Sequence, residues 1–160
     1  MKVLVVDDQW AMRLLVRVNL QSEFVEVLEA ENGHEALEIA QREVPDVILL
    51  DVMMPGIDGF ETAEMLAVDP RTSRIPIVFL SARAEHASQA RGLALGAADY
   101  ITKPFNPASL FEVIERLLAD LASGRIDARR RQKLDRLQSL LRMSESRIRR
   151  STSRPERPSV

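Results

Sequence analysis

The chain contains no cysteine among its 160 residues, which excludes disulfide frameworks and thiolate metal sites. Aromatic residues make up only 4% of the sequence and hydrophobic residues of all kinds 46%, so aliphatic side chains must fill the core. Long apolar stretches are also missing, since none approaches the ~20 residues that a membrane span needs. The apolar run at the N-terminus is short and ends in acids, unlike a signal peptide. We therefore expect a soluble, cytoplasmic protein without membrane insertion.

Charged residues are abundant but unevenly distributed, although the net charge is only −2. Residues 1–122 hold 10 Lys+Arg against 20 Asp+Glu, a balance of −10. Residues 123–160 hold 12 against 4, a balance of +8. This asymmetry predicts an acidic body that carries a basic tail. We expect one domain over residues 1–122, a basic helical extension over 123–150 and a disordered tail over 151–160.

Short apolar runs closed by polar or turn-forming residues are typical of buried strands, and several occur along the body. The plainest is 47–50, an unbroken apolar run that stops at Asp51. Segments with helical apolar spacing or capping residues separate these runs, and the first has Ala11, Leu14, Leu15 and Val18 on one helical stripe. The alternation predicts an α/β fold, a flavodoxin-like doubly wound five-stranded parallel sheet of order 2-1-3-4-5 with a C-terminal helical extension. The expected strands are 2–6, 24–30, 47–50, 77–80 and 97–102, and the expected helices are 11–18, 32–40, 60–67, 85–95 and 107–121.

Polar side chains at the carboxyl ends of the expected strands form the candidate site, because open parallel sheets bind ligands at this edge. The strand order places Asp7 and Asp8 beside Asp51, while Ser81 and Lys103 follow from the last two strands. Three close carboxylates raise one another's pKa unless a cation neutralises them. Oxygen ligands without histidine or cysteine favour a hard ion such as Mg²⁺. With a lysine and a hydroxyl nearby, the sequence predicts phosphoryl transfer onto a carboxylate.

Several short motifs accompany these acids along the body of the chain. They are Asp7-Asp8, Asp51, Met54-Pro55-Gly56, Asp58-Gly59, Ser81, Tyr100 and Lys103-Pro104. In this combination they resemble the receiver domain of bacterial response regulators, the phosphoacceptor module of two-component systems. The resemblance covers about residues 1–121. It implies that Asp51 accepts a phosphoryl group from a sensor histidine kinase or a phosphotransfer protein.

The resemblance also implies which groups hold the metal. Asp8 would ligate Mg²⁺ directly together with Asp51, and Asp7 would lie nearby or act through water. The backbone carbonyl of Met53 would be a further ligand. The expected cofactor is therefore a magnesium ion held by oxygen atoms alone.

The resemblance further implies a route from the chemistry to a binding surface. Lys103, followed by a cis peptide to Pro104, would contact the phosphate. Ser81 would move toward the phosphate, and Tyr100 would rotate inward on the face formed by the fourth helix, the fifth strand and the fifth helix. That face would signal to a downstream effector protein. The chain would thus act by binding and not as an enzyme, with weak autodephosphorylation at most.

Two other functions stay open at the level of sequence. A Mg²⁺-dependent aspartyl-phosphate phosphatase would use Asp51 as a turnover nucleophile, but Met53 occupies the position where such enzymes carry a general acid. Nucleic-acid binding would use the arginine-rich tail, but no base-reading motif is present and the acidic body repels nucleic acid. We therefore expect a phosphoacceptor without a nucleic-acid partner.

The tail is expected to form a helix with an apolar seam of its own. The seam consists of Leu134, Leu137, Leu141 and Ile148, with Ser144 as a break. Leu134 lies ~220° around a continuous helix from Leu121, so the seam does not continue the apolar face of the preceding helix. Gly124 either ends that helix or is tolerated inside a longer one. We expect the seam to face a partner, including possible self-association through residues 134–148.

Overall fold

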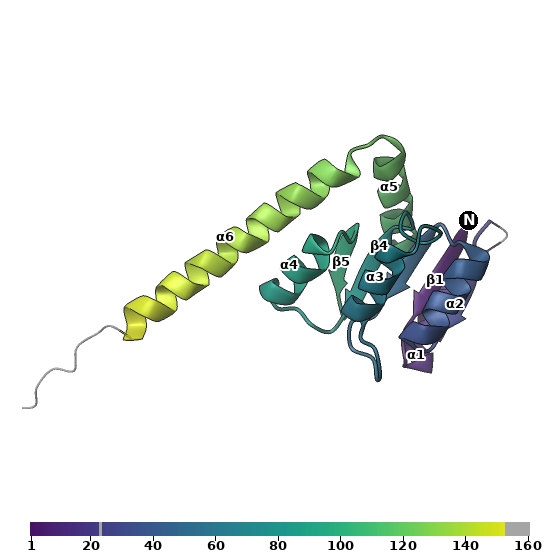
Figure 1. Cartoon of the computed structure of the whole chain (residues 1–160), viewed down its shortest axis with the longest axis horizontal. Helices are drawn as coiled ribbons and strands as arrows, with labels where there is room; N and C mark the ends of the chain where they lie inside the picture. The colour runs from purple at the N-terminus through teal and green to yellow at the C-terminus, as the bar shows by residue number, and fades with distance from the viewer. Residues whose placement is uncertain (23, 153–160) are drawn as a thin grey trace, which may run out of the picture.

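The sheet has the predicted order. A computed structural model of the chain describes residues 1–22 and 24–152. The strands are β1 (Lys2–Val6), β2 (Glu26–Ala30), β3 (Val47–Leu50), β4 (Ile77–Ser81) and β5 (Asp99–Thr102). They pair in parallel in the order β2-β1-β3-β4-β5, and helices lie on both sides of the sheet (Figure 1). The doubly wound flavodoxin-like fold is therefore confirmed.

The helices form two layers around this sheet. They are α1 (Trp10–Leu20), α2 (Gly33–Glu43), α3 (Gly59–Val68), α4 (His86–Ala94), a 3₁₀ turn (Pro107–Ser109), α5 (Leu110–Ala122) and α6 (Ile126–Thr152). Buried side chains of α1 and α5 pack on one face of β1, β3 and β4, and those of α2 and α3 pack on the other. Because both faces are covered, every side chain of β3 is buried. Within the part of the chain that the structure describes, no helix is both long and apolar enough to cross a membrane.

The first helix forms where predicted but turns a different face to the core. Val16 and Leu20 are buried, whereas Leu15 is 39% exposed and Val18 is 70% exposed. Apolar residues occur on both sides of this short helix, so the docking of the helix on the sheet selects which of them are buried. The second strand is also shorter than predicted, since it begins at Glu26 and Phe24 is exposed.

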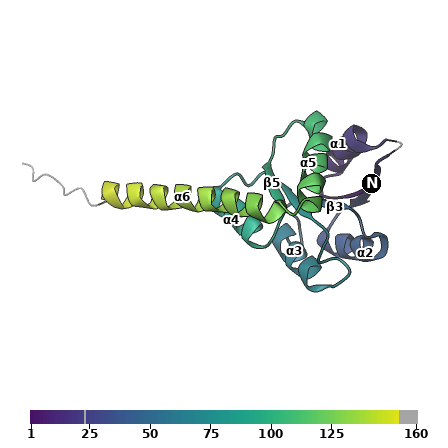
Figure 2. The same ribbon diagram turned by 90° about the horizontal axis from the view of Figure 1, so that it is seen from above.

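The tail forms one long helix that turns back onto the domain. Helix α5 ends at Ala122, and Gly124 with φ +69° reverses the chain direction, which settles the choice left open by the sequence. Helix α6 then runs along α4 and projects beyond the domain (Figures 1 and 2). Ile126 is buried within the chain, and so is Leu137 of the predicted seam, so in the docked helix these two side chains do not face a partner. The side chain of Ile148, another member of that seam, lies outside the described residues. The helix reaches Thr152, two residues past the predicted boundary, and residues 153–160 lie outside the described part.

Candidate functional site

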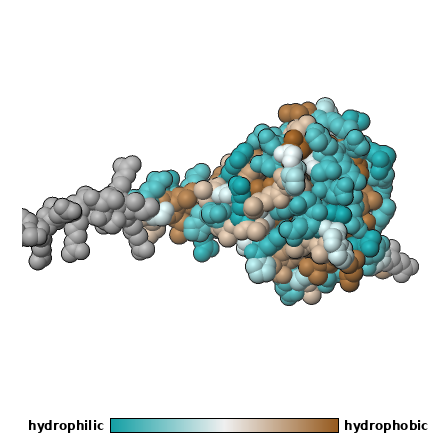
Figure 3. Space-filling model, turned by 90° about the horizontal axis from the view of Figure 1, so that it is seen from below, coloured by the Kyte–Doolittle hydropathy of each residue, from teal (hydrophilic) through white to brown (hydrophobic). Residues whose placement is uncertain are grey.

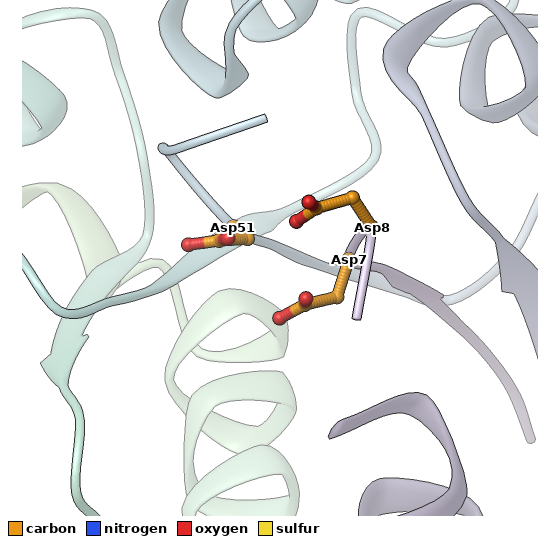
Figure 4. Close-up of side chains that lie close together, drawn as sticks. All are labelled: Asp7, Asp8 and Asp51. Carbon is orange, nitrogen blue, oxygen red and sulfur yellow. The ribbon is translucent and has the colours of Figure 1, made fainter. Parts of the chain in front are cut away.

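Three aspartates meet at the carboxyl edge of the sheet. Asp7 follows β1 and Asp51 follows β3, and the ladder of these neighbouring strands continues into the bond from the Asp51 N–H to the Val6 carbonyl (2.9 Å). One carboxylate oxygen each of Asp7, Asp8 and Asp51 lies within 4.8 Å of the others. Figure 4 shows the three side chains close together, with Asp7 and Asp8 at one strand end and Asp51 at the next. Asp7 and Asp51 are buried while Asp8 is exposed, so the cluster opens to solvent on one side.

Lys103 supplies the positive charge of this cluster. Its Nζ donates a hydrogen bond to Asp7 Oδ2 at 2.6 Å and lies 3.6 Å from Asp51 Oδ1. The lysine directly follows β5, and its backbone N–H donates to the Ser81 carbonyl at the end of β4 (2.8 Å). The peptide bond from Lys103 to Pro104 is cis, as predicted. The pairing with Asp7 was not predicted, because the resemblance gave only the phosphate as a contact of Lys103.

Burial and the neighbouring acids make the Asp51 carboxylate costly to ionise. Burial is the largest cause and raises the pKa of Asp51 to about 6, opposed by the charge of Lys103. The negative charges of Asp7 and Asp8 raise this pKa further. One lysine therefore leaves the three carboxylates undercompensated. A divalent cation with oxygen preference fits this donor set, since it would remove the remaining repulsion and no nitrogen or sulfur ligand is offered.

This imbalance predicts a pH-dependent stability difference between the natural chain and Asp51→Asn without divalent ions. The folded-state pKa of Asp51 exceeds its usual value of 3.8, so the carboxyl stabilises the fold fully below pH 3.8 and loses that contribution as pH rises through about 6. Asparagine does not titrate. Between these pH values the free energy of unfolding of the natural chain should therefore fall relative to that of the variant. At neutral pH the variant should be more stable by roughly 2–3 kcal/mol.

Urea unfolding of both chains in chelator, from pH 4 to pH 8, measures this difference. If the two chains differed in free energy of unfolding by the same amount at every pH, the raised pKa of Asp51 would be contradicted. Because the comparison is made at each pH between two otherwise identical chains, contributions from titrating groups distant from Asp51 cancel, and the measured difference belongs to Asp51 together with its neighbours Asp7, Asp8 and Lys103.

The two predicted switch residues meet at one loop. Ser81 Oγ accepts a hydrogen bond from the Arg83 backbone N–H at 3.1 Å, and the Tyr100 hydroxyl donates to the Arg83 carbonyl at 2.8 Å. Both Ser81 and Tyr100 are buried. The backbone of Arg83 thus links them, a role that sequence analysis missed because backbone groups leave no residue-type signal. Met53, by contrast, is 52% exposed beside a surface depression that Asp8, Asp58 and Arg83 also line.

Helix α3 approaches the end of β3 at Asp51 very closely. Asp58 and Glu61 form a capping box, in which each side chain accepts from the other residue's backbone N–H. The Gly59 N–H donates to the Val52 carbonyl at 2.9 Å. A Cβ at Gly59 would lie 2.1 Å from the Asp51 carbonyl oxygen, so only glycine allows this approach. Asp58-Gly59 therefore has a structural role and is not part of the acid cluster.

Residues 3–115 match the family described as the response regulator receiver domain. The chain belongs to this family. The receiver is 38% identical over 158 residues to the phosphate regulon transcriptional regulatory protein PhoB of Rhizobium meliloti, covering 99% of this chain and 65% of PhoB. It is 35% identical over 118 residues to PilH of Pseudomonas aeruginosa, covering 74% of this chain and 98% of PilH. A solved structure of the chemotaxis protein CheY4 of Vibrio cholerae matches with a TM-score of 0.68 and 37% identity, covering 72% of this chain and 97% of CheY4.

These similarities extend to the function of the domain. Receivers of this family are phosphoacceptor signalling domains of two-component systems, and the acid cluster with its lysine fits that role. They are signalling domains and not enzymes in the usual sense. The chain spans 65% of the length of PhoB, so what that regulator does through its remaining part is not carried over to this receiver.

Proposed function

We propose that Asp51 of this chain accepts a phosphoryl group from a sensor histidine kinase or a phosphotransfer protein. The observation that carries this is the setting of its carboxylate: nearly buried, within 4.8 Å of the Asp7 and Asp8 carboxylates, and 3.6 Å from Lys103 Nζ. In the transfer, an Asp51 oxygen forms a bond to phosphorus while the bond from phosphorus to the donor imidazole nitrogen breaks, and that nitrogen keeps the electron pair. The product is an acyl phosphate on Asp51.

The residues around Asp51 supply the metal ligands and the charge compensation. Asp8, Asp51 and the Met53 backbone carbonyl would hold Mg²⁺, with Asp7 close by, and the ion would supply positive charge against the phosphoryl oxygens. Lys103 orients and neutralises a phosphoryl oxygen. Because Lys103 pairs with Asp7 in the described structure, the phosphoryl group competes with Asp7 for this ammonium. Ser81 donates its hydroxyl to the same group.

Phosphorylation is read out on the face that α4, β5 and α5 form, by a downstream effector protein in the cytoplasm. The added group carries roughly −1.5 to −2 charge, so the surroundings of Lys103 and Ser81 must rearrange. Tyr100 reports this change because its hydroxyl and the Ser81 hydroxyl bind the same residue, Arg83. Self-association through residues 134–148 is a second output of the same switch, since the exposed Leu140 and Met143 lie on this stretch.

A turnover phosphatase is the less favoured function. Such an enzyme needs a general acid two residues after the nucleophile, and Met53 has no ionisable group. Nucleic-acid binding through the tail is also disfavoured, because three of its basic side chains are already engaged within the chain. These are Arg129, Arg130 and Lys133, which bond to carboxylate or carbonyl oxygens of the domain and of α6 itself.

The test is incubation of the full chain with acetyl phosphate and Mg²⁺, followed by peptide mapping of the adduct. We expect one acid-stable, hydroxylamine-sensitive acyl phosphate on the peptide that contains Asp51, and none when the chelator EDTA is present. An adduct on another residue, or no adduct at all, would contradict the proposed function. Rapid release of inorganic phosphate over many cycles would favour the phosphatase.

Lys103→Ala is expected to separate phosphorylation from the conformational response. Removing the ammonium leaves all three carboxylates, so Mg²⁺ still binds and Asp51 is still labelled, but the phosphoryl group loses its contact to the strand-end lysine. Amide NMR shifts of α4 and β5 on addition of beryllofluoride should shrink to less than about half, since one of the two groups that sense the phosphate is gone. Lys2→Ala, at the opposite end of the sheet, is the matched control and should respond as the natural chain does. A full response in Lys103→Ala would refute the role of this lysine.

A further inference from the structure

The tail helix occupies the face that the proposed function uses for output. Helix α6 lies along α4 in both views of the chain and reaches β5 (Figures 1 and 2). Two apolar side chains anchor it: Ile126 joins the core cluster of α1 and α5, and Leu137 is only 6% exposed. The remainder of α6 projects from the domain, where Figure 3 shows apolar patches among hydrophilic side chains. The face is therefore already covered in part by a segment of the same chain.

Ion pairs fix where the helix sits. Lys133 Nζ bonds to the Asp99 carboxylate at the start of β5, and Arg129 lies 3.8 Å from the other Asp99 oxygen. Arg129 also donates to Asp120 on α5 at 2.7 Å, and Arg130 donates to the Gly96 carbonyl after α4 at 2.9 Å. The basic tail thus contacts α4, β5 and α5, which accounts for its attraction to an acidic body. Asp99 is 8% exposed, and both cations that approach its carboxylate come from α6.

A short series of hydrogen bonds runs from the docked helix to Ser81, which lies at the end of β4 beside the acid cluster. Lys133 Nζ donates to the Tyr100 carbonyl at 3.2 Å. The hydroxyl of Tyr100 donates to the Arg83 carbonyl, and the Arg83 N–H donates to Ser81 Oγ at the strand end beside the site. The Tyr100 N–H also donates to Asp99, the carboxylate that holds Lys133. A displacement of Ser81 or of the Tyr100 ring therefore acts directly on the residues that bind α6.

Helix α4 transmits such a displacement because no side chain separates its backbone at Gly92 from the ring of Tyr100. A Cβ at Gly92 would lie 2.9 Å from Phe79 Cδ2 and 3.0 Å from Tyr100 Cδ2, so the helix backbone rests on these rings. Only Gly92 and Leu93 of α4 are buried. A helix with so few buried side chains shifts at low cost. A movement of Tyr100 therefore shifts α4, the helix along which α6 lies.

The packing of α6 is also incomplete on its α5 side. A cavity of about 320 Å³ remains between β5, the start of α5 and the docked helix. Arg116, Arg129 and Lys133 line it together with the apolar Phe105 and Val113. Docking that depends on partly exposed ion pairs and two buried apolar residues is weak enough to be reversed.

We propose that α6 is the resident intramolecular occupant of the α4–β5–α5 face, and that phosphorylation of Asp51 releases it. In the unphosphorylated chain the helix shields this face from the effector. Release exposes both the face and the apolar side of a basic helix, so the partner that it fits is an acidic protein surface with an apolar groove. This inference rests on the proposed phosphoacceptor function and adds its regulation.

The absence of cysteine allows a clean test with single introduced thiols in the full chain. Leu137→Cys places a thiol under the docked helix, and Leu140→Cys, whose native side chain is 38% exposed, places one nearby on the open side. Maleimide should modify the thiol at position 137 more slowly than the thiol at position 140 when only Mg²⁺ is present. Beryllofluoride, as the phosphoryl mimic, should raise the rate at position 137 several-fold and leave position 140 unchanged.

A second comparison tests the ion pairs. In the Leu137→Cys chain, Lys133→Ala should raise the modification rate roughly five-fold without beryllofluoride, the change that loss of one favourable ion pair gives. Arg131→Ala is the matched control, because Arg131 is exposed and forms no ion pair among the described residues. Unchanged modification rates in Lys133→Ala would show that the ion pair between Lys133 and Asp99 does not hold α6 against the domain.

Three outcomes would overturn the proposal while leaving the phosphoacceptor assignment intact. Equal modification rates at positions 137 and 140 with Mg²⁺ alone would show that α6 is not docked. Protection at position 137 that increases with protein concentration would show that a second copy supplies the helix. Protection that survives beryllofluoride, in chains whose Asp51 is labelled by acetyl phosphate, would show that phosphorylation does not release it. Failure of Asp51 to be labelled would instead refute the proposed function itself.

Discussion

Asp51→Asn is expected to abolish phosphoryl labelling by acetyl phosphate in the presence of Mg²⁺. The neutral amide has no nucleophilic oxygen comparable to a carboxylate, and losing the nucleophile of a covalent reaction costs on the order of 10³-fold or more. The fold should survive, because asparagine nearly matches aspartate in size and removes the buried charge whose ionisation is unfavourable. Loss of labelling would then report chemistry and not unfolding. Mass spectrometry of the intact chain, with peptide mapping, measures it.

The control for this variant is Asp58→Asn. Asp58 also lies at the mouth of the site, but its side chain caps α3, and asparagine is as good an N-cap as aspartate. Labelling of this control should stay within about two-fold of the natural chain, since the acid cluster and Lys103 are unchanged. Labelling that persists at position 51 in Asp51→Asn would disprove the nucleophile. Labelling that moves to Asp8 would show that the cluster, and not one residue, determines reactivity.

Gly59→Ala is expected to destabilise the chain by about 3 kcal/mol or more. The added methyl group would lie 2.1 Å from the Asp51 carbonyl oxygen and 2.7 Å from the Val52 Cα, both of them backbone atoms that cannot rotate away. Either α3 must move off the sheet or the Asp51 segment must shift. Both responses disturb the Asp51–Val52 backbone that Gly59 contacts, so labelling should fall along with stability. Urea unfolding followed by circular dichroism gives the free-energy change.

Gly56→Ala separates this steric effect from backbone strain. Gly56 has φ +79°, but nothing lies within 4 Å of a Cβ built there. Its replacement should therefore cost only about 1 kcal/mol, the usual penalty of an L-residue in the left-handed region. If Gly59→Ala were no more harmful than Gly56→Ala, the close approach of α3 to the strand end would not exist in solution.

The sequence alone was sufficient for the sheet order and for the meeting of three aspartates at one edge. The unbroken apolar segment Val47–Leu50 predicts a strand buried on both faces, because only a covered parallel strand tolerates such a run. Parallel order then places the residues that follow the strands at one edge, and this predicts that Asp7, Asp8 and Asp51 meet there. Signals of this kind are predictive because each depends on residues that are neighbours in the chain.

Features that depend on distant partners were not predictable in this way. Lys103 and Asp7 are 96 positions apart, and the choice of Asp7 over Asp51 as its closest partner follows from the relative positions of strand ends. The spacing of apolar residues likewise predicted the wrong buried side for α1, since Val18 is exposed and Val16 is buried. Apolar residues on both sides of a helix leave its orientation to the sheet on which it packs.

The tail shows the same division most clearly. Its composition determined that residues beyond 123 would be basic and that a helix with apolar positions would form there. Only the tertiary structure decided that this helix lies along α4 with Lys133 against Asp99, because a surface that matches its charge and its apolar residues exists only after β5, α4 and α5 have assembled. Sequence determines which groups attract one another, and the fold determines which of them come within reach.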